Sequence, residues 1–339
     1  MKKDKNIGDE SNFSSPLGAR VSFGVRGKIL ICPLNWGLGH AARCVPLIRK
    51  LMGEGHEPVL VSDGFALEFL RQEFSTLRTI EFPSYSIYYA AGKSQVGAML
   101  YNMPNIITGI LREHFWLKAL LNTEHFDQVI SDNRFGMWNK KVHSIYITHQ
   151  LMVKMPPYLK ALEPLVRLIH KAFITRYDEC WIPDIKERGG LSGDLAHKYP
   201  LPKNATFIGT LSRFQGMENI PPNPNYDVVA VISGVESQRS IFEKNLIEKY
   251  GRRPEKILIV CGQPQTKKIE RRLGNITLVS HLSDSEMVSV LLGAKKVISR
   301  SGYSTIMDLA ALNCLHKAEL IPTPGQTEQQ YLASIHCRK

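Results

Sequence analysis

Long apolar runs and paired cysteines are both missing from this sequence. No stretch approaches the length of a membrane-spanning helix, and residues 1–26 are polar and lack the apolar core of a secretory signal. The six cysteines are scattered without a CxxC spacing, so neither a disulfide framework nor a zinc site is indicated. We therefore expect a cytoplasmic protein that begins with a disordered polar tail over residues 1–26.

The patterns of several other protein classes are missing as well. Gly37 and Gly39 form a GxG without the third glycine of a dinucleotide fingerprint, which disfavours a nicotinamide enzyme. No DxD pair stands in a context that would hold a metal. The formal charge is +12, yet no nucleic-acid-binding motif accompanies it. Anionic membrane lipid, a phosphorylated substrate or a basic surface kept for solubility would each explain the charge, and the first would place the protein at the inner face of the membrane.

The remaining composition is that of an ordinary globular protein, with 43% apolar and 22% charged residues among 339. That length favours two domains. Five prolines fall between Tyr199 and Asn225, where we expect the connection. The predicted division is a first domain at 27–210, a proline-rich linker at 211–225 and a second domain at 226–339.

The first domain opens with a strand, a glycine turn, a helix and a second strand. Residues 28–33 and 58–62 are apolar strand candidates, and 40–52 has the spacing of an amphipathic helix. This order predicts a right-handed βαβ unit of a parallel sheet. The glycines permit a sharp turn beside a ligand, with His40 at the start of the helix. His40 is a candidate general base; alternatively, it caps its own helix or donates to a backbone carbonyl.

Two later strands of this domain end in polar residues. Residues 128–131 lead to Asp132, and 142–148 lead to His149. The carboxyl ends of parallel strands open onto the crevice in which ligands sit. Asp132 could hold His40 in a productive tautomer or cap the next helix, and His149 is a second acid–base candidate.

The second domain repeats the pattern of an apolar strand followed by a polar turn. Its strand candidates lie at 226–232, 256–261, 276–280, 296–299 and 318–321. Helices are predicted at 303–312, with Ser301 and Ser304 as candidate N-caps, and at 326–332. Helix N-termini carry unpaired N–H groups and partial positive charge, which suits a phosphate, and Asp308 lies one turn inside, where a carboxylate suits ribose hydroxyls. The same residues also fit a ligand-free βαβ unit in which the serines are only caps.

The order SRSGYST, DLAAL and then IPTPGQTEQQYLA resembles the nucleotide-sugar half of GT-B glycosyltransferases. It is most similar to glycosyltransferase family 28, which includes the N-acetylglucosaminyltransferase of peptidoglycan lipid II synthesis. The first half of the chain resembles that family only through the loop from Gly37 to His40 and the alternating pattern. The resemblance implies an α/β protein of the GT-B fold, with two Rossmann-like β/α/β domains facing each other across a cleft.

By that resemblance, the donor is a nucleotide diphosphate sugar, most commonly a UDP-sugar, and inverting transfer of the hexose or N-acetylhexosamine needs neither metal nor cofactor. Asp308 would contact the ribose, although the family has Glu there, and His281 stands where the nucleotide base is met through main chain. Arg300 would approach phosphate or pair with a neighbouring acid. The implied donor contacts are Gly39, Ser233, Gly234, His281, Arg300, Ser301, Gly302, Ser304, Asp308, Gln326, Glu328, Gln329 and Gln330.

The acceptor would be a hydroxyl compound, with lipid-linked and cell-envelope glycans as candidates. His40, oriented by Asp132, would be the base, and Asn35 and His149 would contact the acceptor. Residues 84–121 are rich in aromatic residues and Met. In the family such elements lie near the membrane, although an apolar stripe is more often core. The chain ends soon after QQYLA, where GT-B enzymes carry a further helix, so we expect looser closure.

Two other functions stay open. A nucleotide-sugar 2-epimerase would use the same crevice and need no acceptor. A non-catalytic nucleotide-sugar or lipid-phosphate binding protein would be indifferent to replacement of His40 by Ala. No nucleic acid partner is expected, and association with an anionic membrane is open.

Overall fold

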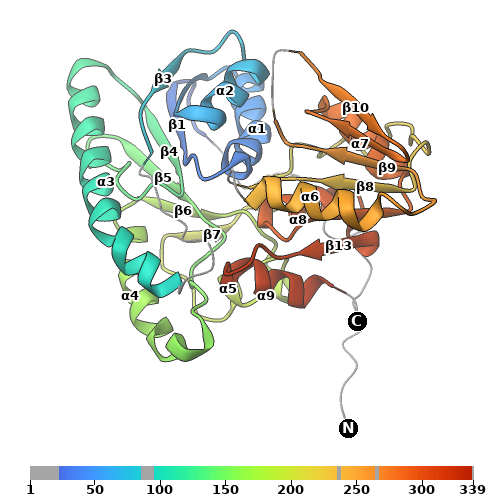
Figure 1. The fold of residues 1–339 in the computed structure, drawn as a ribbon. Coiled ribbons are helices and arrows are strands. Elements are labelled where there is room, and N and C mark those ends of the chain that lie inside the picture. The colour runs from blue at the N-terminus through green and yellow to red at the C-terminus, as the bar shows by residue number, and fades with distance from the viewer. Residues whose placement is uncertain (1–22, 85–94, 235–237, 264–266, 338–339) are drawn as a thin grey trace.

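The chain forms two lobes, each built around its own sheet (Figure 1). The computed structural model describes residues 23–84, 95–234, 238–263 and 267–337, with the backbone alone for 95–101. The expected polar tail falls on residues 1–22, which lie outside the described residues, and on 23–26. Phe23 is buried against His56 and Trp181, so packing begins before residue 27.

The N-terminal lobe contains a seven-stranded sheet in the order β3-β2-β1-β4-β5-β6-β7. All of its pairs are parallel. Its strands are β1 (Lys28–Pro33), β2 (Glu57–Ser62), β3 (Thr79–Glu81), β4 (Gln128–Asp132), β5 (His143–Ile147), β6 (Glu179–Ile182) and β7 (Ala205–Phe207). Successive residues face opposite sides of a strand, and both sides are buried here: Ile29 and Leu30 belong to different core clusters. This is why the strands read as continuous apolar runs.

The helices of this lobe are α1 (Leu38–Gly53), α2 (Gly64–Glu73), α3 (Gln95–Thr123), α4 (Glu163–Ile174) and the single turn α5 (Asp194–His197), with 3₁₀ turns at Pro157–Leu162 and Glu187–Gly189. Residues 157–174 are therefore divided between a 3₁₀ turn and α4. Pro164 lacks an N–H and suits the first turn of a helix, so α4 begins at Glu163. The aromatic segment at 84–121 is the long helix α3 where it is described, and residues 85–94 lie outside the described residues.

The C-terminal lobe contains a six-stranded sheet in the order β10-β11-β9-β8-β12-β13. Its strands are β8 (Val228–Val231), β9 (Ile257–Val260), β10 (Glu270–Leu273), β11 (Ile276–Val279), β12 (Lys296–Arg300) and β13 (Ala318–Ile321). Its helices are α6 (Gln238–Tyr250), α7 (Asp284–Gly293), α8 (Tyr303–Ala311) and α9 (Thr327–His336), with a 3₁₀ turn at Leu315–Lys317. Only β10 is antiparallel to its neighbour, and its residues are exposed, so its sequence ERRL carries no apolar pattern.

The predicted N-caps of α8 are wrong. Gly302 is the N-cap residue, and no side chain caps this helix. The Ser301 hydroxyl instead donates to the carbonyl of Gln329 at 2.8 Å, and the Ser304 hydroxyl donates to the carbonyl of Gly39 at 3.0 Å. Both serines therefore join segments that are distant in sequence.

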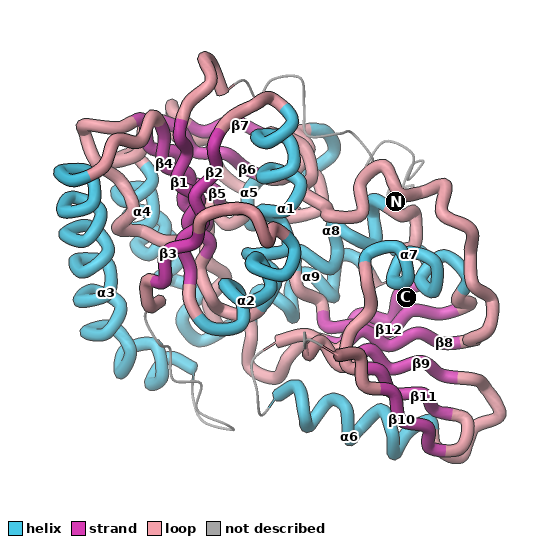
Figure 2. The backbone as a smooth tube through the Cα atoms, turned by 90° about the horizontal axis from the view of Figure 1, so that it is seen from above, coloured by secondary structure: helices cyan, strands magenta, loops and turns pink. Residues whose placement is uncertain are grey.

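The lobes meet through the helices and loops that follow the carboxyl ends of their strands. Seen from above, α1, α8 and α9 lie between the two sheets (Figure 2). The helix α1 contacts α8 across the lobes, and residues 208–227, which connect β7 to β8, contain no helix or strand. The loops after β1 and β5 thus face the loops after β12 and β13.

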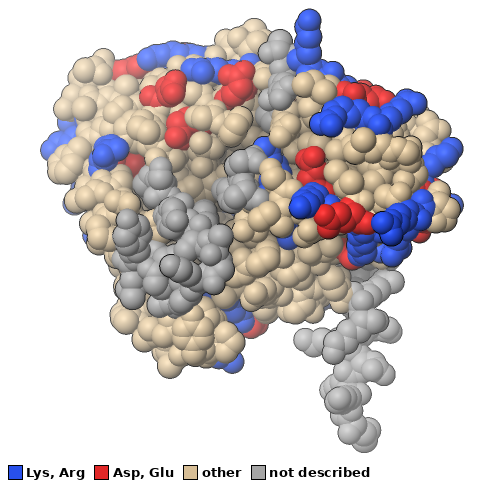
Figure 3. All heavy atoms as spheres, viewed as in Figure 1, with Lys and Arg blue, Asp and Glu red and all other residues tan. Residues whose placement is uncertain are grey.

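The surface and helix lengths add two observations. On the face drawn in Figure 3, the described Lys and Arg side chains are spread over both lobes, with Asp and Glu among them. In the part of the chain that the structure describes, no helix is both long and apolar enough to cross a membrane.

Candidate functional site

His40 and Asp132 lie within hydrogen-bond distance at the junction of the lobes. His40 is in the first turn of α1, after the turn at Gly37, and Asp132 ends β4. Nδ1 of His40 is 2.8 Å from Oδ1 of Asp132. No helix occurs between residues 133 and 142, so Asp132 does not cap one. The pairing leaves Nε2 of His40 as the ring nitrogen that can accept a proton from a substrate.

Arg43 adds a positive charge to the His40–Asp132 pair, and no sequence pattern predicts this contact. It is buried one turn after His40, and its Nε donates to Oδ2 of Asp132 at 2.5 Å while Nη2 donates to Oδ1. Burial alone would raise the pKa of Asp132, but Arg43 and His40 outweigh it and hold that pKa well below its usual range. Burial and then Arg43 lower the pKa of His40, and Asp132 offsets only part of this. The dyad therefore holds a carboxylate and a neutral imidazole at neutral pH.

A cavity of about 290 Å³ opens between the lobes. Five of the predicted donor residues line it, namely Gly39, Ser233, His281, Ser304 and Asp308. They come from the start of α1, from the ends of β8 and β11, and from α8. The apolar part of the wall includes Leu38, Phe69, Phe214, Leu282, Met287 and Leu309. Positions from across the chain thus converge, as the rule for carboxyl ends of parallel strands predicts.

Glycine turns let the lobes approach closely at this cavity. A Cβ added at Gly39 would lie 3.0 Å from the Ser304 hydroxyl. Gly37 has a φ of 88°, in the region that favours glycine, and a Cβ there would lie 4.0 Å from Cα of Gly234. The starts of α1 and α8 therefore meet beside the turn that precedes α6. Residues 235–237, which follow that turn, lie outside the described residues.

The start of α8 presents polar groups to the cavity. Ser304 and Thr305 line it, and the N–H groups of a first helical turn have no acceptor within the helix. The buried hydroxyl of Ser299, the penultimate residue of β12, lines the same cavity and has no hydrogen-bond partner among the described residues. These groups could bind an anion or a hydroxyl-bearing ligand.

Asp308 faces the same cavity from the second turn of α8. Its Oδ1 accepts a hydrogen bond of 2.7 Å from the hydroxyl of Ser212, which belongs to the connection between the lobes. Burial raises the pKa of Asp308 to about 6, and the nearby Arg213 and the Ser212 hydroxyl offset only part of this. The carboxylate is thus ionised at neutral pH and close to its titration range.

The first turn of α9 reaches the N-terminal lobe through Glu328. Its Oε1 is 2.7 Å from Nε2 of His149, whose Nδ1 is 3.2 Å from Nη1 of Arg43. The His149 ring also stacks on Tyr303, with ring centroids 4.1 Å apart and an angle of 2° between the planes. Both nitrogens of His149 are therefore engaged within the protein, and the expected acceptor contact has no free ring nitrogen.

The glutamines before and within α9 have different positions. Oε1 of Gln329 accepts from the N–H of Thr323 at 2.8 Å, and Nε2 of Gln329 donates to Oε1 of Gln326 at 2.6 Å. The side-chain amides of Gln326 and Gln329 therefore hold the turn that precedes the helix. Gln330 is exposed and does not line the cavity. Asn35, the other acceptor candidate, follows β1, and its N–H donates to the Ser84 hydroxyl at 3.2 Å.

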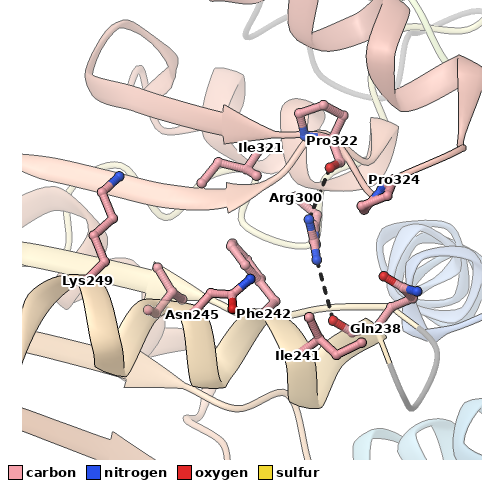
Figure 4. A pocket seen from close by; sticks show the side chains of 10 residues that line it. Gln238, Ile241, Phe242, Asn245, Lys249, Arg300, Ile321, Pro322 and Pro324 are labelled. Carbon is pink, nitrogen blue, oxygen red and sulfur yellow. Dashed lines mark hydrogen bonds between the residues drawn. The ribbon is translucent and has the colours of Figure 1, made fainter. Parts of the chain in front are cut away.

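Arg300 faces away from the interlobe cavity. It projects toward α6 and lines a separate hollow of about 220 Å³ (Figure 4). Its guanidinium lies 4.0 Å from the centre of the Phe242 ring and donates to the carbonyls of Pro322 and Gln238. Adjacent residues of β12 point to opposite faces, which places Ser299 in the cavity and Arg300 on the other side.

Sequence patterns gave little or no indication that Arg43 and Ser212 belong to the site. Arg43 breaks the apolar face of α1, between Ala41 and Cys44, and a charge on a buried face indicates a buried partner. Ser212 lies in an irregular segment with no pattern. Among the described residues, no three His, Cys, Asp or Glu side chains are grouped so that they could hold a metal ion.

Comparisons with known proteins bear on the fold. No family model matches the sequence, and no curated protein matches it either. Solved structures do match. The glycotransferase of kitacinnamycin has a TM-score of 0.58 and 15% identity over 91% of this chain and 84% of its own. CalG4, the calicheamicin glycosyltransferase, has a TM-score of 0.57 and 13% identity over 92% and 88%. UGT89C1 from Arabidopsis thaliana, complexed with UDP-L-rhamnose, has a TM-score of 0.51 and 10% identity over 92% and 89%.

These neighbours, together with the two facing sheets, show that the chain has the GT-B fold, as expected from the sequence. At 10–15% identity these neighbours show the fold and do not identify a particular family.

Proposed function

We propose that this protein is an inverting glycosyltransferase that moves a sugar from a uridine diphosphate sugar to a hydroxyl acceptor without a metal ion. One observation carries the proposal: five of the thirteen residues predicted from the sequence as donor contacts line one interlobe cavity beside the His40–Asp132 pair. The GT-B fold supports it, since the structural neighbours include the kitacinnamycin and calicheamicin glycosyltransferases, and a third neighbour, UGT89C1, is complexed with UDP-L-rhamnose.

The donor would lie between the lobes with its diphosphate at the start of α8. The free N–H groups and the positive end of that helix favour an anion, and they would stabilise the charge that develops on the leaving diphosphate. Asp308 would accept hydrogen bonds from the ribose hydroxyls. Glu328, on the first turn of α9, would contact the donor sugar.

In the reaction, the acceptor oxygen attacks the anomeric carbon while the bond from that carbon to the diphosphate oxygen breaks. The bonding electrons leave with the nucleoside diphosphate. Nε2 of His40 takes the acceptor's proton, and the Asp132 carboxylate stabilises the imidazolium that forms. Attack opposite the leaving group inverts the anomeric configuration.

A thermal-shift panel tests the donor site. Uridine, guanosine and thymidine diphosphates and their sugars are added to the protein with and without EDTA. We expect a uridine compound to stabilise the protein, by about 2.7 kcal/mol at a concentration 100 times its Kd, with no effect of EDTA. Asp308→Ala should remove the shift, whereas Glu248→Ala, on the exposed face of α6, should keep it. Stabilisation by no member of the panel would contradict the donor assignment.

Turnover separates this function from its alternatives. Incubation with a donor alone should release no free epimer. An epimerase, which needs no acceptor, would release it under the same conditions. His40→Ala should abolish transfer to an acceptor while donor binding persists. Transfer at the normal rate in that variant would exclude His40 as the base.

We further propose that the acceptor is presented by an anionic membrane, at a surface formed by α3 and α4. On α3, exposed apolar residues recur at every fourth position, and α4 adds others: Met103, Ile107, Leu111, Phe115, Leu165, Leu168 and Ile169. The exposed charged residues of α3, of α4 and of the 3₁₀ turn that precedes α4 are cationic, namely Arg112, Lys118, Lys160 and Lys171. The carboxylates of these helices, Glu113 and Glu163, are buried in ion pairs. Apolar side chains flanked by cations suit an anionic bilayer surface.

Vesicle sedimentation tests this surface. The protein should bind vesicles of phosphatidylglycerol and not vesicles of phosphatidylcholine alone, and salt should weaken the binding. Phe115→Glu should reduce binding about 5-fold or more, because it replaces an inserted ring by a charge of the wrong sign. Ile241→Glu is the matched control, since Ile241 is also exposed, on α6 of the other lobe. Equal losses in both variants would contradict the assignment.

A further inference from the structure

We propose that Arg43 is the positioning residue of the site: its guanidinium sets the tautomer of His149, holds the Asp132 carboxylate that orients His40, and through His149 orients the Glu328 carboxylate toward the donor. The catalytic part of this inference rests on the function proposed above. No pattern in the sequence assigned a role to Arg43.

The guanidinium of Arg43 touches three partners at once. Nε and Nη2 form a two-point contact with the carboxylate of Asp132. Nη2 is also 2.9 Å from Nδ1 of His40, and Nη1 is 3.2 Å from Nδ1 of His149. The side chain is 2% exposed, so these contacts are shielded from water. A planar fork of five N–H groups can serve several acceptors in fixed directions, which the ammonium of lysine cannot do.

The tautomer of His149 follows from this contact. Guanidinium nitrogens only donate, so Nδ1 of His149 must accept from Arg43 and carry no proton. The proton of the neutral ring is then on Nε2, from where it donates to Oε1 of Glu328 at 2.7 Å. The parallel stack on Tyr303 fixes the plane of the ring, and the Tyr303 hydroxyl itself donates to the carbonyl of Pro183 at 2.9 Å.

Glu328 is thereby held from the opposite lobe. His149 occupies one carboxylate oxygen, and the side chain of Glu328 is still 32% exposed, so a donor hydroxyl can reach the group. Because His149 donates to Oε1, the other carboxylate oxygen of Glu328 remains available as an acceptor. A carboxylate fixed in this way would select a sugar by the position of its hydroxyls.

At His40 the guanidinium competes with Asp132 for the same nitrogen. When Nδ1–H donates to Asp132, Nε2 has the lone pair that a general base needs. When Nδ1 accepts from Arg43, the proton lies on Nε2 and the ring cannot act as a base. The two-point contact with Arg43 keeps the Asp132 carboxylate charged and in place. Because Oδ1 of that carboxylate lies 2.8 Å from Nδ1 of His40, the productive tautomer is favoured.

Arg43 also adjusts how readily His40 is protonated. The charged or titratable groups that face His40 are Arg43 on α1, Asp132 after β4, His149 after β5 and Glu328 on α9. Asp132 favours the imidazolium, and Arg43 opposes it. Replacing Arg43 by a neutral side chain should therefore raise the pKa of His40 by about 1–2 units, since a charge in contact typically shifts a pKa by that amount.

Imidazole nitrogen NMR on the full chain tests the network without any ligand. In the wild-type protein, His149 should be neutral with its proton on Nε2. In Arg43→Met, the titration midpoint of His40 should rise by about 1 unit or more, whereas Lys50→Met in the last turn of α1 should leave it unchanged. A proton on Nδ1 of wild-type His149, or an unchanged His40 midpoint in folded Arg43→Met, would overturn the proposal. If Arg43→Met does not fold, the wild-type tautomer alone decides.

Kinetics then test the donor side. His149→Phe keeps the stack on Tyr303 and removes the bond to Glu328, so the KM for the donor sugar should rise about 10-fold with kcat within about 3-fold. A loss confined to kcat would contradict the orienting role. If wild-type protein shows no turnover or donor binding at all, the proposed function fails, while the NMR result for Arg43 stands separately.

Discussion

Replacing Asp308 by Asn should change how the stability of the protein depends on pH. The pKa of Asp308 is about 6 in the folded protein, against 3.8 for an unperturbed aspartate. The folded state therefore binds this proton more tightly than the unfolded state does. For an acid whose pKa is raised, stability is lost as the pH rises through the interval between the two values, here from about 4 to about 6.

The size of the effect follows from the shift. A difference of about two pKa units corresponds to about 3 kcal/mol over the whole interval. At pH 5, one unit below the folded pKa, about 1.4 kcal/mol of this remains, and at pH 7.5 almost none does. The amide of the variant cannot titrate in this range. The free energy of unfolding of Asp308→Asn should therefore fall less between pH 5 and pH 7.5 than that of the wild type, by about 1.4 kcal/mol.

Urea titrations followed by circular dichroism at the two pH values measure this difference. Ser212→Ala is an informative companion, because the Ser212 hydroxyl lowers the pKa of Asp308 and its loss should move the transition to higher pH. Parallel pH dependence in the wild type and Asp308→Asn would contradict the raised pKa of Asp308, since it would mean that Asp308 is solvated and not desolvated at the cavity.

Two further substitutions test the packing of the site. Asp132→Asn leaves the buried Arg43 without its carboxylate, so it should lower stability by about 3–5 kcal/mol and turnover by orders of magnitude. Glu113→Gln breaks the buried ion pair with Arg134 and should match this stability loss in chemical denaturation while the pH profile of turnover stays the same; a shifted profile in Glu113→Gln would count against the special role of Asp132. Gly262→Ala should destabilise the C-terminal lobe by more than about 1 kcal/mol, because Gly262 has a φ of 62° and a Cβ would come 2.4 Å from the carbonyl oxygen of Ile232; an unchanged melting temperature would contradict this geometry.

Much of the fold could be predicted because buried parallel strands appear in the sequence as uninterrupted apolar runs. Residues 28–33 and 318–321 were predicted at the bounds that the structure has. The exposed strand β10 could not be found this way, since a solvent-facing edge strand needs no apolar residue. Neither could the short β7, whose ATF sequence is too brief for any periodicity to appear.

The candidate site was predictable where function follows from position along a strand. Ser233, His281 and Asp132 each stand at or just after a strand end, and the topology of a parallel sheet brings such ends together. The direction of a side chain at a strand end is a finer matter: Arg300 faces α6 because it is one residue beyond Ser299. Arg43 meets Asp132 and His149, and Glu328 meets His149, only through contacts between distant segments, which no local pattern encodes.

If the start of α8 receives a diphosphate between the lobes, its amides should respond when the ligand binds. An amide NMR titration of the labelled protein with uridine diphosphate tests this. We expect the largest shifts at the amides of residues 303–305, with smaller ones at Gly39 and Asp308. Shifts centred elsewhere, or none at millimolar concentrations, would contradict it.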